Sequence, residues 1–113
     1  MDKGGYVYIM ASKGKRLYTG VTPELRIRVK QHKNKVHPSS HTARYNIDQL
    51  VYFEAFETIN EAIARESAIK NMHRIEKVKV IVAMNPDWAD LSLVWDKPAE
   101  PFDESRMRKP ETF

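Results

Sequence analysis

Three linked patterns near the N-terminus decide the fold of this chain: Tyr6-Val7-Tyr8, then Tyr18-Thr19-Gly20, then Thr22-x-x-Leu25-x-x-Arg28-x-x-x-His32. The first two fall in short stretches that alternate in the strand sense, and the third has helical spacing. A hairpin and the helix after it would bring two tyrosines, an arginine and a histidine together. Such a group supplies a proton acceptor and a cation, which phosphate chemistry requires.

The chain around the tyrosine patterns predicts a hairpin with strands over residues 6–11 and 17–21. Side chains alternate between the two faces of a strand. Tyr18 and Gly20 therefore share one face, and we expect Tyr8 and Tyr18 to lie side by side. Gly20 offers the bare backbone that a closely packed position requires.

The helix that follows is predicted to start at Thr22 and Pro23, with a hydroxyl at the N-cap and a preset φ at the first helical position. Its predicted apolar stripe consists of Leu25, Val29 and Val36. The helical period places Arg28 and His32 at the border of this stripe. We therefore expect both side chains to face inward.

Further along, residues 36–47 are polar and indicate a mobile loop, whereas residues 50–56 predict a third strand. That strand would complete a small antiparallel sheet. Residues 58–61 have the sequence of a capping box, which predicts a second helix extending to about Met72.

Glu66 is the most unusual residue of this second helix, because the helical period places it among apolar residues. The stripe around it consists of Ile59, Ala62 and Ile69. An unpaired buried carboxylate is costly, so Glu66 requires a compensating charge. A divalent cation is one candidate. A salt bridge to Lys70 one turn on, or to Arg28, is the other.

The composition indicates one domain, since the chain has 113 residues, 42% of them hydrophobic, and no obvious linker. The absence of cysteine excludes disulfides and thiolate metal sites, and favours a reducing cytoplasm. The longest aliphatic run, Val80 to Met84, is too short to span a bilayer, and the N-terminus lacks a signal-peptide core. We expect a soluble, cytoplasmic protein with no membrane association.

Positive charge is concentrated in residues 13–44, which hold nine Lys or Arg against one acid, whereas residues 45–96 hold five against nine. A block of this kind is typical of a protein that binds a polyanion. A solvated basic face, or pairing with the acidic half in a homodimer, would also account for it. The candidate nucleic-acid-binding residues are Lys13, Lys15, Arg16, Arg26, Lys30, Lys33, Lys35 and Arg44.

The two tyrosine triplets, with Arg28 and His32, resemble the GIY-YIG endonuclease domain. Residues 63–70 resemble the glutamate-bearing helix of that family, and residues 85–91 a C-terminal segment of its small stand-alone bacterial members, which are related to the nuclease domain of the excision-repair system. The resemblance runs from about Tyr6 to Leu91. Tyr6 stands where the family name has Gly, and Thr19 where it has Ile.

The resemblance implies an α/β (α+β) fold, a small three-stranded antiparallel sheet flanked by helices in the order β-β-α-β-α-α. It also favours a helix over residues 75–84, although valine and isoleucine there have high strand propensity. We expect residues 1–96 to form the domain, with the segment up to Trp95 packing back through Trp88, Leu91 and Leu93. Residues 97–113 are expected to be a disordered tail.

The resemblance further implies a DNA endonuclease that hydrolyses phosphodiester bonds with one Mg²⁺ or Mn²⁺ ion held by Glu66. In this interpretation Arg28 stabilises the charge that develops on the phosphate. Tyr8, aided by His32, orients or deprotonates the attacking water, and Tyr18 hydrogen-bonds the phosphate or that water. Such an enzyme could be directed by DNA structure and act in DNA repair or recombination.

Two other classes stay open at the level of the sequence. One is a nucleic-acid-binding module of the same fold without catalytic turnover. The other is a structural protein whose basic block pairs with an acidic protein partner or with a second copy. Metal-dependent nicking of DNA would distinguish an enzyme from the binding module. Salt-sensitive DNA binding would distinguish the enzyme and the binding module from the structural protein.

Overall fold

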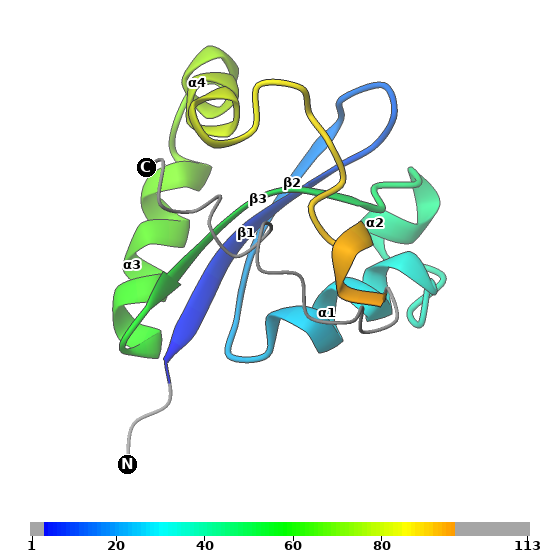
Figure 1. The fold of residues 1–113 in the computed structure, drawn as a ribbon, viewed down its shortest axis with the longest axis horizontal. Helices are drawn as coiled ribbons and strands as arrows, with labels where there is room; N and C mark the ends of the chain where they lie inside the picture. Colours follow the sequence, from blue (N-terminus) through cyan, green and yellow to red (C-terminus); the bar gives the residue numbers. More distant parts are fainter. Residues whose placement is uncertain (1–3, 97–113) are drawn as a thin grey trace, which may run out of the picture.

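A central three-stranded sheet organises the protein, and the computed structural model describes it over residues 4–96. The elements are β1 (Gly5–Ala11), β2 (Leu17–Thr22), α1 (Leu25–Lys33), α2 (His41–Arg44), β3 (Gln49–Phe56), α3 (Ile59–Lys70), α4 (Arg74–Met84) and the 3₁₀ helix η1 (Leu93–Asp96). The strand order is β2-β1-β3, and both pairings are antiparallel (Figure 1). The predicted sheet and the order β-β-α-β-α-α are confirmed.

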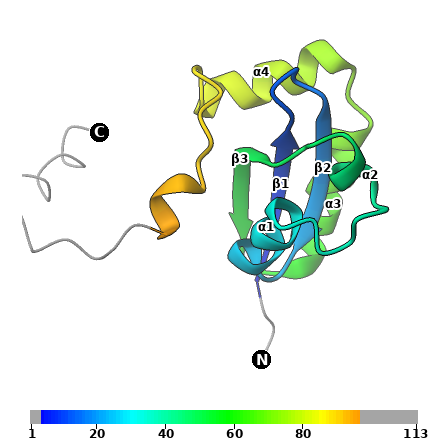
Figure 2. The same cartoon turned by 90° about the vertical axis from the view of Figure 1, so that its right-hand side faces the viewer.

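Helices cover both faces of the sheet (Figure 2). Helix α3 packs on β1 and β2 from one side, and α1 with α2 lies on the opposite side. Strand β1 is central, so its side chains contribute alternately to the two layers. Its odd-numbered residues from Val7 to Ala11 face α3, and its even-numbered residues Tyr8 and Met10 face α1.

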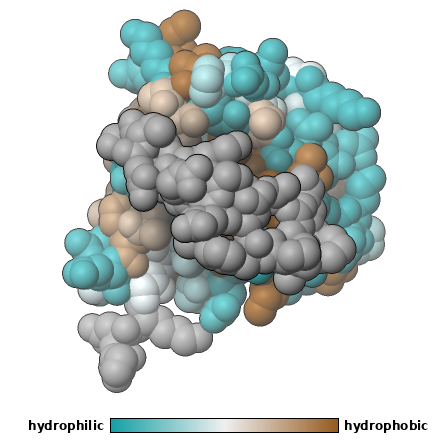
Figure 3. Space-filling model, in the orientation of Figure 1, coloured by the Kyte–Doolittle hydropathy of each residue, from teal (hydrophilic) through white to brown (hydrophobic). Residues whose placement is uncertain are grey.

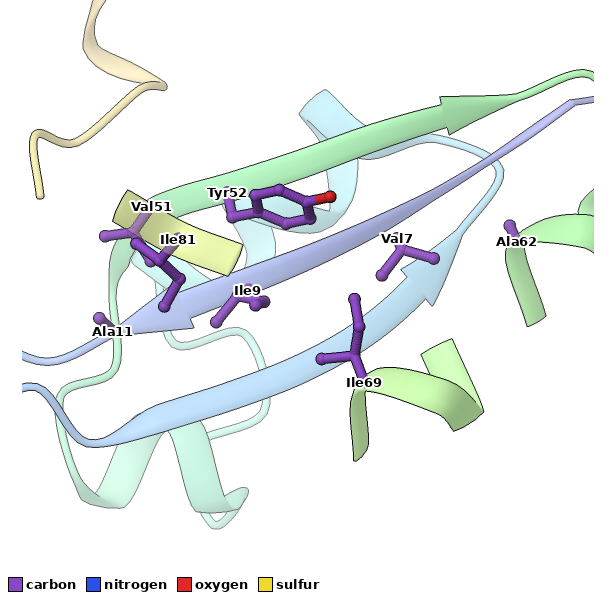
Figure 4. Close-up of a cluster of buried hydrophobic side chains, with 8 residues drawn as sticks. All are labelled: Val7, Ile9, Ala11, Val51, Tyr52, Ala62, Ile69 and Ile81. Atoms are coloured by element: carbon purple, nitrogen blue, oxygen red, sulfur yellow. The ribbon is translucent and has the colours of Figure 1, made fainter. Parts of the chain in front are cut away.

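The core under α3 is buried and mainly apolar, and Figure 4 shows how its side chains lie. It consists of Val7, Ile9, Ala11, Val51, Tyr52, Ala62, Ile69 and Ile81. Residues from β1, β3, α3 and α4 meet in this cluster, so burial of their apolar surface holds the helices against the sheet. This layer is a scaffold, because Tyr52 is its one residue with a side-chain polar atom.

The layer under α1 has a different character, because aromatic and ionisable groups are mixed into it. Its buried apolar residues are Tyr8, Met10, Leu25, Val29, Ile47 and Leu50. Tyr6, Tyr18, Phe53, Leu91 and Trp95 pack against them while partly exposed. His32 and Thr42 are also buried, at 5% exposure each. The predicted site residues on β1, β2 and α1 therefore share this layer.

The start of helix α1 differs from the prediction. Thr22 is the last residue of β2, where it pairs with Tyr6, so it does not serve as N-cap. Its hydroxyl instead accepts a hydrogen bond from the backbone N–H of Glu24, at 3.1 Å. The helix ends at Lys33, so Val36, at 52% exposure, is not part of the buried stripe.

Residues 36–47 contain the short helix α2, where a loop was predicted. Ser40 caps it by accepting a hydrogen bond from the N–H of Ala43. The predicted capping box at Thr58 and Glu61 is present, and α3 ends at Lys70 instead of Met72. The helix predicted over residues 75–84 is confirmed as α4, so tertiary context overrides strand propensity there.

The segment after α4 is held against the N-terminal end of β3. The side-chain amide of Asn85 donates to the carbonyl of Val51, and the N–H of Leu91 donates to the carbonyl of Leu50. Trp88 and Leu91 pack on the core as predicted, whereas Leu93 is 62% exposed, and Trp95 packs in its place.

Residues 97–113, predicted to be a tail, lie outside the described residues. Within residues 4–96, no helix is both long and apolar enough to cross a membrane.

Candidate active site

Tyr8 lies at the centre of the site, on the middle strand, with 1% of its surface exposed. Its cross-strand partner on β2 is Gly20. A Cβ atom built on Gly20 would lie 2.5 Å from both Cζ and Oη of Tyr8. The phenol ring therefore crosses directly over a backbone that has no side chain. The absence of a side chain at Gly20 lets the Tyr8 hydroxyl reach helix α1.

A chain of hydrogen bonds continues from Tyr8 into the neighbouring helices. The Tyr8 hydroxyl lies 3.0 Å from Nε2 of His32, and Nδ1 of His32 lies 3.0 Å from Oγ1 of Thr42. Both contacts are buried. Each ring nitrogen of His32 thus has one partner, and the imidazole is fixed between β1 and α2.

Tyr18 completes an aromatic cluster with these two residues. Its ring centroid lies 6.2 Å from that of Tyr8 and 5.3 Å from that of His32. The Tyr18 and His32 rings meet edge to face, at 60°. Tyr18 is half-buried and comes from the outer strand β2, whereas Tyr8 is enclosed. The expected pairing of the two tyrosines is therefore present.

Arg28 lies on α1, one turn before His32, and is half-buried. Its Nη1 donates a hydrogen bond to Oε1 of Gln31, at 3.0 Å. The guanidinium lies close enough to the cluster that its positive charge affects the ionisation of both Tyr8 and His32. A fixed cation therefore borders the two hydrogen-bonded groups.

Burial keeps both Tyr8 and His32 neutral. Desolvation raises the pKa of Tyr8 well above its ordinary value of 10.0, and the nearby Tyr18 adds to this effect, while Arg28 opposes it. Desolvation, together with the charges of Arg28 and His37, lowers the pKa of His32 from 6.5 to about 4. Near neutral pH the pair is a phenol hydrogen-bonded to an uncharged imidazole.

Glu66 comes from α3, which covers the other face of the sheet and contacts β2, the edge strand that carries Tyr18. Its side chain is 15% exposed, as its position in the apolar stripe predicts. Its Oε2 pairs with Nζ of Lys70 at 3.0 Å, one of the two pairings that the sequence left open. Lys70 is 53% exposed, so this pair reaches solvent.

The donor set around Glu66 limits the metal that it could hold. No group of three His, Cys, Asp or Glu side chains suited to a metal ion occurs among residues 4–96. Magnesium is compatible with one protein carboxylate, because it retains water and takes phosphate oxygens from the substrate as further ligands. The residues present therefore fit a hard divalent ion that is shared with a phosphate.

Comparison with known proteins agrees with this geometry. Residues 4–79 match the GIY-YIG catalytic domain. The chain belongs to the GIY-YIG family. It is 42% identical over 76 residues to a UPF0213 protein of Clostridium perfringens. The matched region covers 67% of this chain and 81% of that protein. A UPF0213 protein of Staphylococcus saprophyticus is 40% identical over 81 residues, covering 72% of this chain and 96% of its own.

A solved structure has the same GIY-YIG arrangement. The solution NMR structure of a UPF0213 protein from Bacillus halodurans superposes with a TM-score of 0.51 at 26% identity, and covers 80% of this chain and 96% of its own. The family resemblance and the fold inferred from the sequence are therefore both confirmed.

Most of the basic residues predicted for this GIY-YIG domain lie on its surface. Lys13, Lys15, Arg16, Arg26, Lys30, Lys35 and Arg44 are exposed. In Figure 3, hydrophilic side chains fill the right-hand part of the view, over the β1–β2 turn and α2. Lys33 is the exception, because it is half-buried and forms an ion pair with Asp90 at 2.5 Å.

Four of these cations lie over aromatic rings. Arg16 and Arg44 lie over the ring of Tyr45, at 4.1 and 5.9 Å, Lys15 lies over Trp88 at 5.2 Å, and Arg26 over Trp95 at 5.3 Å. Cations held in this way lose less side-chain freedom when they bind a phosphate. The basic surface is therefore partly ordered.

Sequence reasoning missed three residues of this neighbourhood. Thr42, Gln31 and Tyr45 contact His32, Arg28 and Arg16, respectively. Gln31 could have been found from its i, i+3 spacing to Arg28. The spacing of Ser40 and Ala43 fits a helix N-cap, so a short helix that contains Thr42 could have been predicted. The contact between Thr42 and His32 depends on the tertiary fold.

Proposed function

We propose that this protein is a DNA endonuclease that hydrolyses phosphodiester bonds with the help of one Mg²⁺ or Mn²⁺ ion. The observation that carries this proposal is the buried hydrogen bond between the Tyr8 hydroxyl and Nε2 of His32, at 3.0 Å. A phenol tied to a neutral imidazole, with a cation beside it, suits proton transfer next to a phosphate. Membership of the GIY-YIG catalytic family supports the same activity.

Tyr8 and His32 act on the attacking water as a unit in this proposal. The raised pKa of Tyr8 excludes a standing phenolate near neutral pH, so Tyr8 acts as a phenol. Its oxygen accepts a hydrogen bond from water while its own proton points to Nε2 of His32. A proton can then pass from water to Tyr8 as the phenol proton passes to His32, and no free phenolate forms.

Arg28 supplies the positive charge in this mechanism. Hydrolysis places additional negative charge on the scissile phosphate, and a fixed guanidinium offsets it without reorganising. The hydrogen bond to Gln31 helps to orient the side chain of Arg28. Tyr18, half-buried at the border of the cluster, donates a hydrogen bond from its hydroxyl to the phosphate or to the water.

Glu66 would hold the ion, with water and phosphate oxygens as the other ligands. Once bound, the ion would neutralise phosphate charge and polarise the bond to phosphorus. Glu66 is released for this role at little cost, because its partner Lys70 is half exposed and stays hydrated when the pair opens.

The partner in this proposal is DNA, bound through the basic residues of 13–44. The charge of that block and its aromatic contacts support it. A role in DNA repair or recombination, directed by DNA structure, fits a compact domain of this family. The alternative is a DNA-binding module of the same fold without turnover.

The test is incubation of the full chain with flaps, branched junctions, single strands and plain duplex, with Mg²⁺, Mn²⁺ or chelator. We expect cleavage of at least one of these substrates, dependent on the ion. Salt-sensitive binding without cleavage under every condition would favour the binding module instead.

A further inference from the structure

Thr42 is buried at 5% exposure and reaches the site from a segment outside the sheet and helix α1. Its Oγ1 lies 3.0 Å from Nδ1 of His32 and 3.3 Å from Oγ of Ser40. The Oγ of Ser40 in turn accepts a hydrogen bond from the backbone N–H of Ala43. The hydroxyl of Thr42 is therefore fixed at the start of α2, directly behind the imidazole.

The contacts leave two consistent directions for the chain of protons. In the first, Tyr8 donates to Nε2, the Nδ1–H of His32 donates to Thr42, and Thr42 donates to Ser40. In the second, every donor is reversed, and the Nε2–H of His32 donates to the Tyr8 oxygen. Thr42 takes part in both, because its hydroxyl is the partner of Nδ1 and can either accept from it or donate to it.

The charge of Arg28 favours the first direction. Nε2 is the nitrogen that faces Tyr8, and the positive charge of Arg28 acts on both Tyr8 and His32. A proton on Nε2 would point toward this positive region, whereas a proton on Nδ1 points away from it. The first direction also leaves the Tyr8 oxygen free to accept a hydrogen bond from water.

We propose that Thr42 is a positioning residue that accepts the Nδ1–H of His32, so that Nε2 is held as the acceptor of the Tyr8 proton. This inference rests on the proposed function, since its use is to prepare Tyr8 and His32 for proton transfer from water. It assigns the segment between α1 and β3 a part in catalysis without contact to substrate.

The direct test reads the tautomer of His32 and needs no DNA. Long-range ¹H–¹⁵N correlation spectra of the full chain, labelled at its four histidines and recorded near pH 7.5, report which ring nitrogen carries the proton. The His32 signals are assigned by their loss in His32→Gln. We expect Nδ1–H in the wild type, and a wild-type ring with the proton on Nε2 would overturn the inference whether or not any variant folds.

Variants at position 42 separate positioning from packing. Thr42→Val keeps the shape but removes the hydroxyl, and we expect a shift of His32 toward the Nε2–H tautomer. Thr42→Ser retains the hydroxyl and is expected to restore Nδ1–H. An unchanged tautomer in Thr42→Val would contradict the inference.

Cleavage gives the second readout. Thr42→Val should lower the single-turnover rate about ten- to a hundredfold, as the loss of an orienting partner does at other sites, with DNA affinity unchanged. Thr42→Ser should recover most of the rate. Equal loss in both variants would indicate a packing role only. If the wild type cuts no DNA, the proposed function fails, while the tautomer spectra still decide the role of Thr42.

Discussion

Gly20 shows how much of the site depends on the size of one residue. A Cβ at this position would lie 2.5 Å from the Tyr8 hydroxyl oxygen, the atom that bonds His32. We predict that Gly20→Ala lowers cleavage by on the order of a hundredfold, because small displacements of a reacting group are costly. It should also destabilise the fold by roughly 1–3 kcal/mol through overpacking.

Gly14→Ala is the matched control for this prediction. The nearest atom to a Cβ at Gly14 is Oγ of Ser12, at 3.9 Å, which is ordinary contact. Single-turnover cleavage and urea unfolding of both variants give the comparison. Equal activity of Gly20→Ala and wild type would show that the position of Tyr8 is not essential.

His32 gives a prediction about pH. Its pKa is about 4 in the folded protein, against 6.5 ordinarily. Between these values the unfolded chain binds a proton that the folded protein does not, so stability falls as pH falls from 6.5 to 4. The loss from this group is on the order of 3 kcal/mol.

His32→Gln removes this contribution and serves as the reference. Urea unfolding at pH 7 and at pH 4.5 should show a larger loss for the wild type than for the variant. Parallel losses in the two proteins would mean that His32 is not held neutral by burial.

The residue types of the site could be predicted from sequence where local spacing determines them. Alternation along two strands placed Tyr8 beside Tyr18, and the helical period placed His32 inward. Thr42 could not be predicted in this way, since ten residues separate it from His32 and the chain turns between them. Contacts of that kind depend on the tertiary fold.

At the scale of elements, α3 presents Glu66 from an apolar stripe while pairing it with Lys70. We predict that Glu66→Gln abolishes metal-dependent cleavage and changes the melting temperature by at most a few degrees. Its partner Lys70 is 53% exposed, so it stays hydrated once the carboxylate is gone.

Lys70→Ala is the control for Glu66→Gln, since it opens the same ion pair and leaves the carboxylate in place. It should keep the cleavage activity. Melting curves with and without Mg²⁺ or Mn²⁺ accompany the assay. A Glu66→Gln protein that melts far below wild type yet still cuts DNA would refute the metal-ligand role.

Element boundaries were the least predictable part of the fold. Thr22 has the chemistry of an N-cap, but ladder pairing with Tyr6 keeps it in β2, and the helix begins three residues later. In α4, by contrast, strand-favouring residues adopt a helix because Ile81 packs into the core under α3. In both places tertiary pairing outweighs local preference.

For the whole molecule, the distribution of charge predicts how binding to DNA, the proposed partner, depends on salt. The affinity should fall steeply between about 50 and 200 mM salt, because several basic side chains of residues 13–44 replace counterions on phosphates. Arg26→Ala should reduce the slope of log affinity against log salt by about 1. Lys79→Ala, an exposed change on α4 outside the block, should leave it unchanged. A flat salt response would remove DNA as the partner of this surface.

In the proposed mechanism, Arg28 belongs to a catalytic centre with Tyr8 and His32. Arg26, two residues away, belongs to the exposed basic surface that binds DNA. The decisive measurement is the single-turnover cleavage rate of wild type, Arg28→Ala and Arg26→Ala on one DNA substrate, with Mg²⁺ and with chelator. We predict a loss of on the order of a hundredfold or more for Arg28→Ala with DNA binding largely kept, and a small effect for Arg26→Ala. Equal losses in the two variants, or cleavage by Arg28→Ala at the wild-type rate, would contradict this role of Arg28.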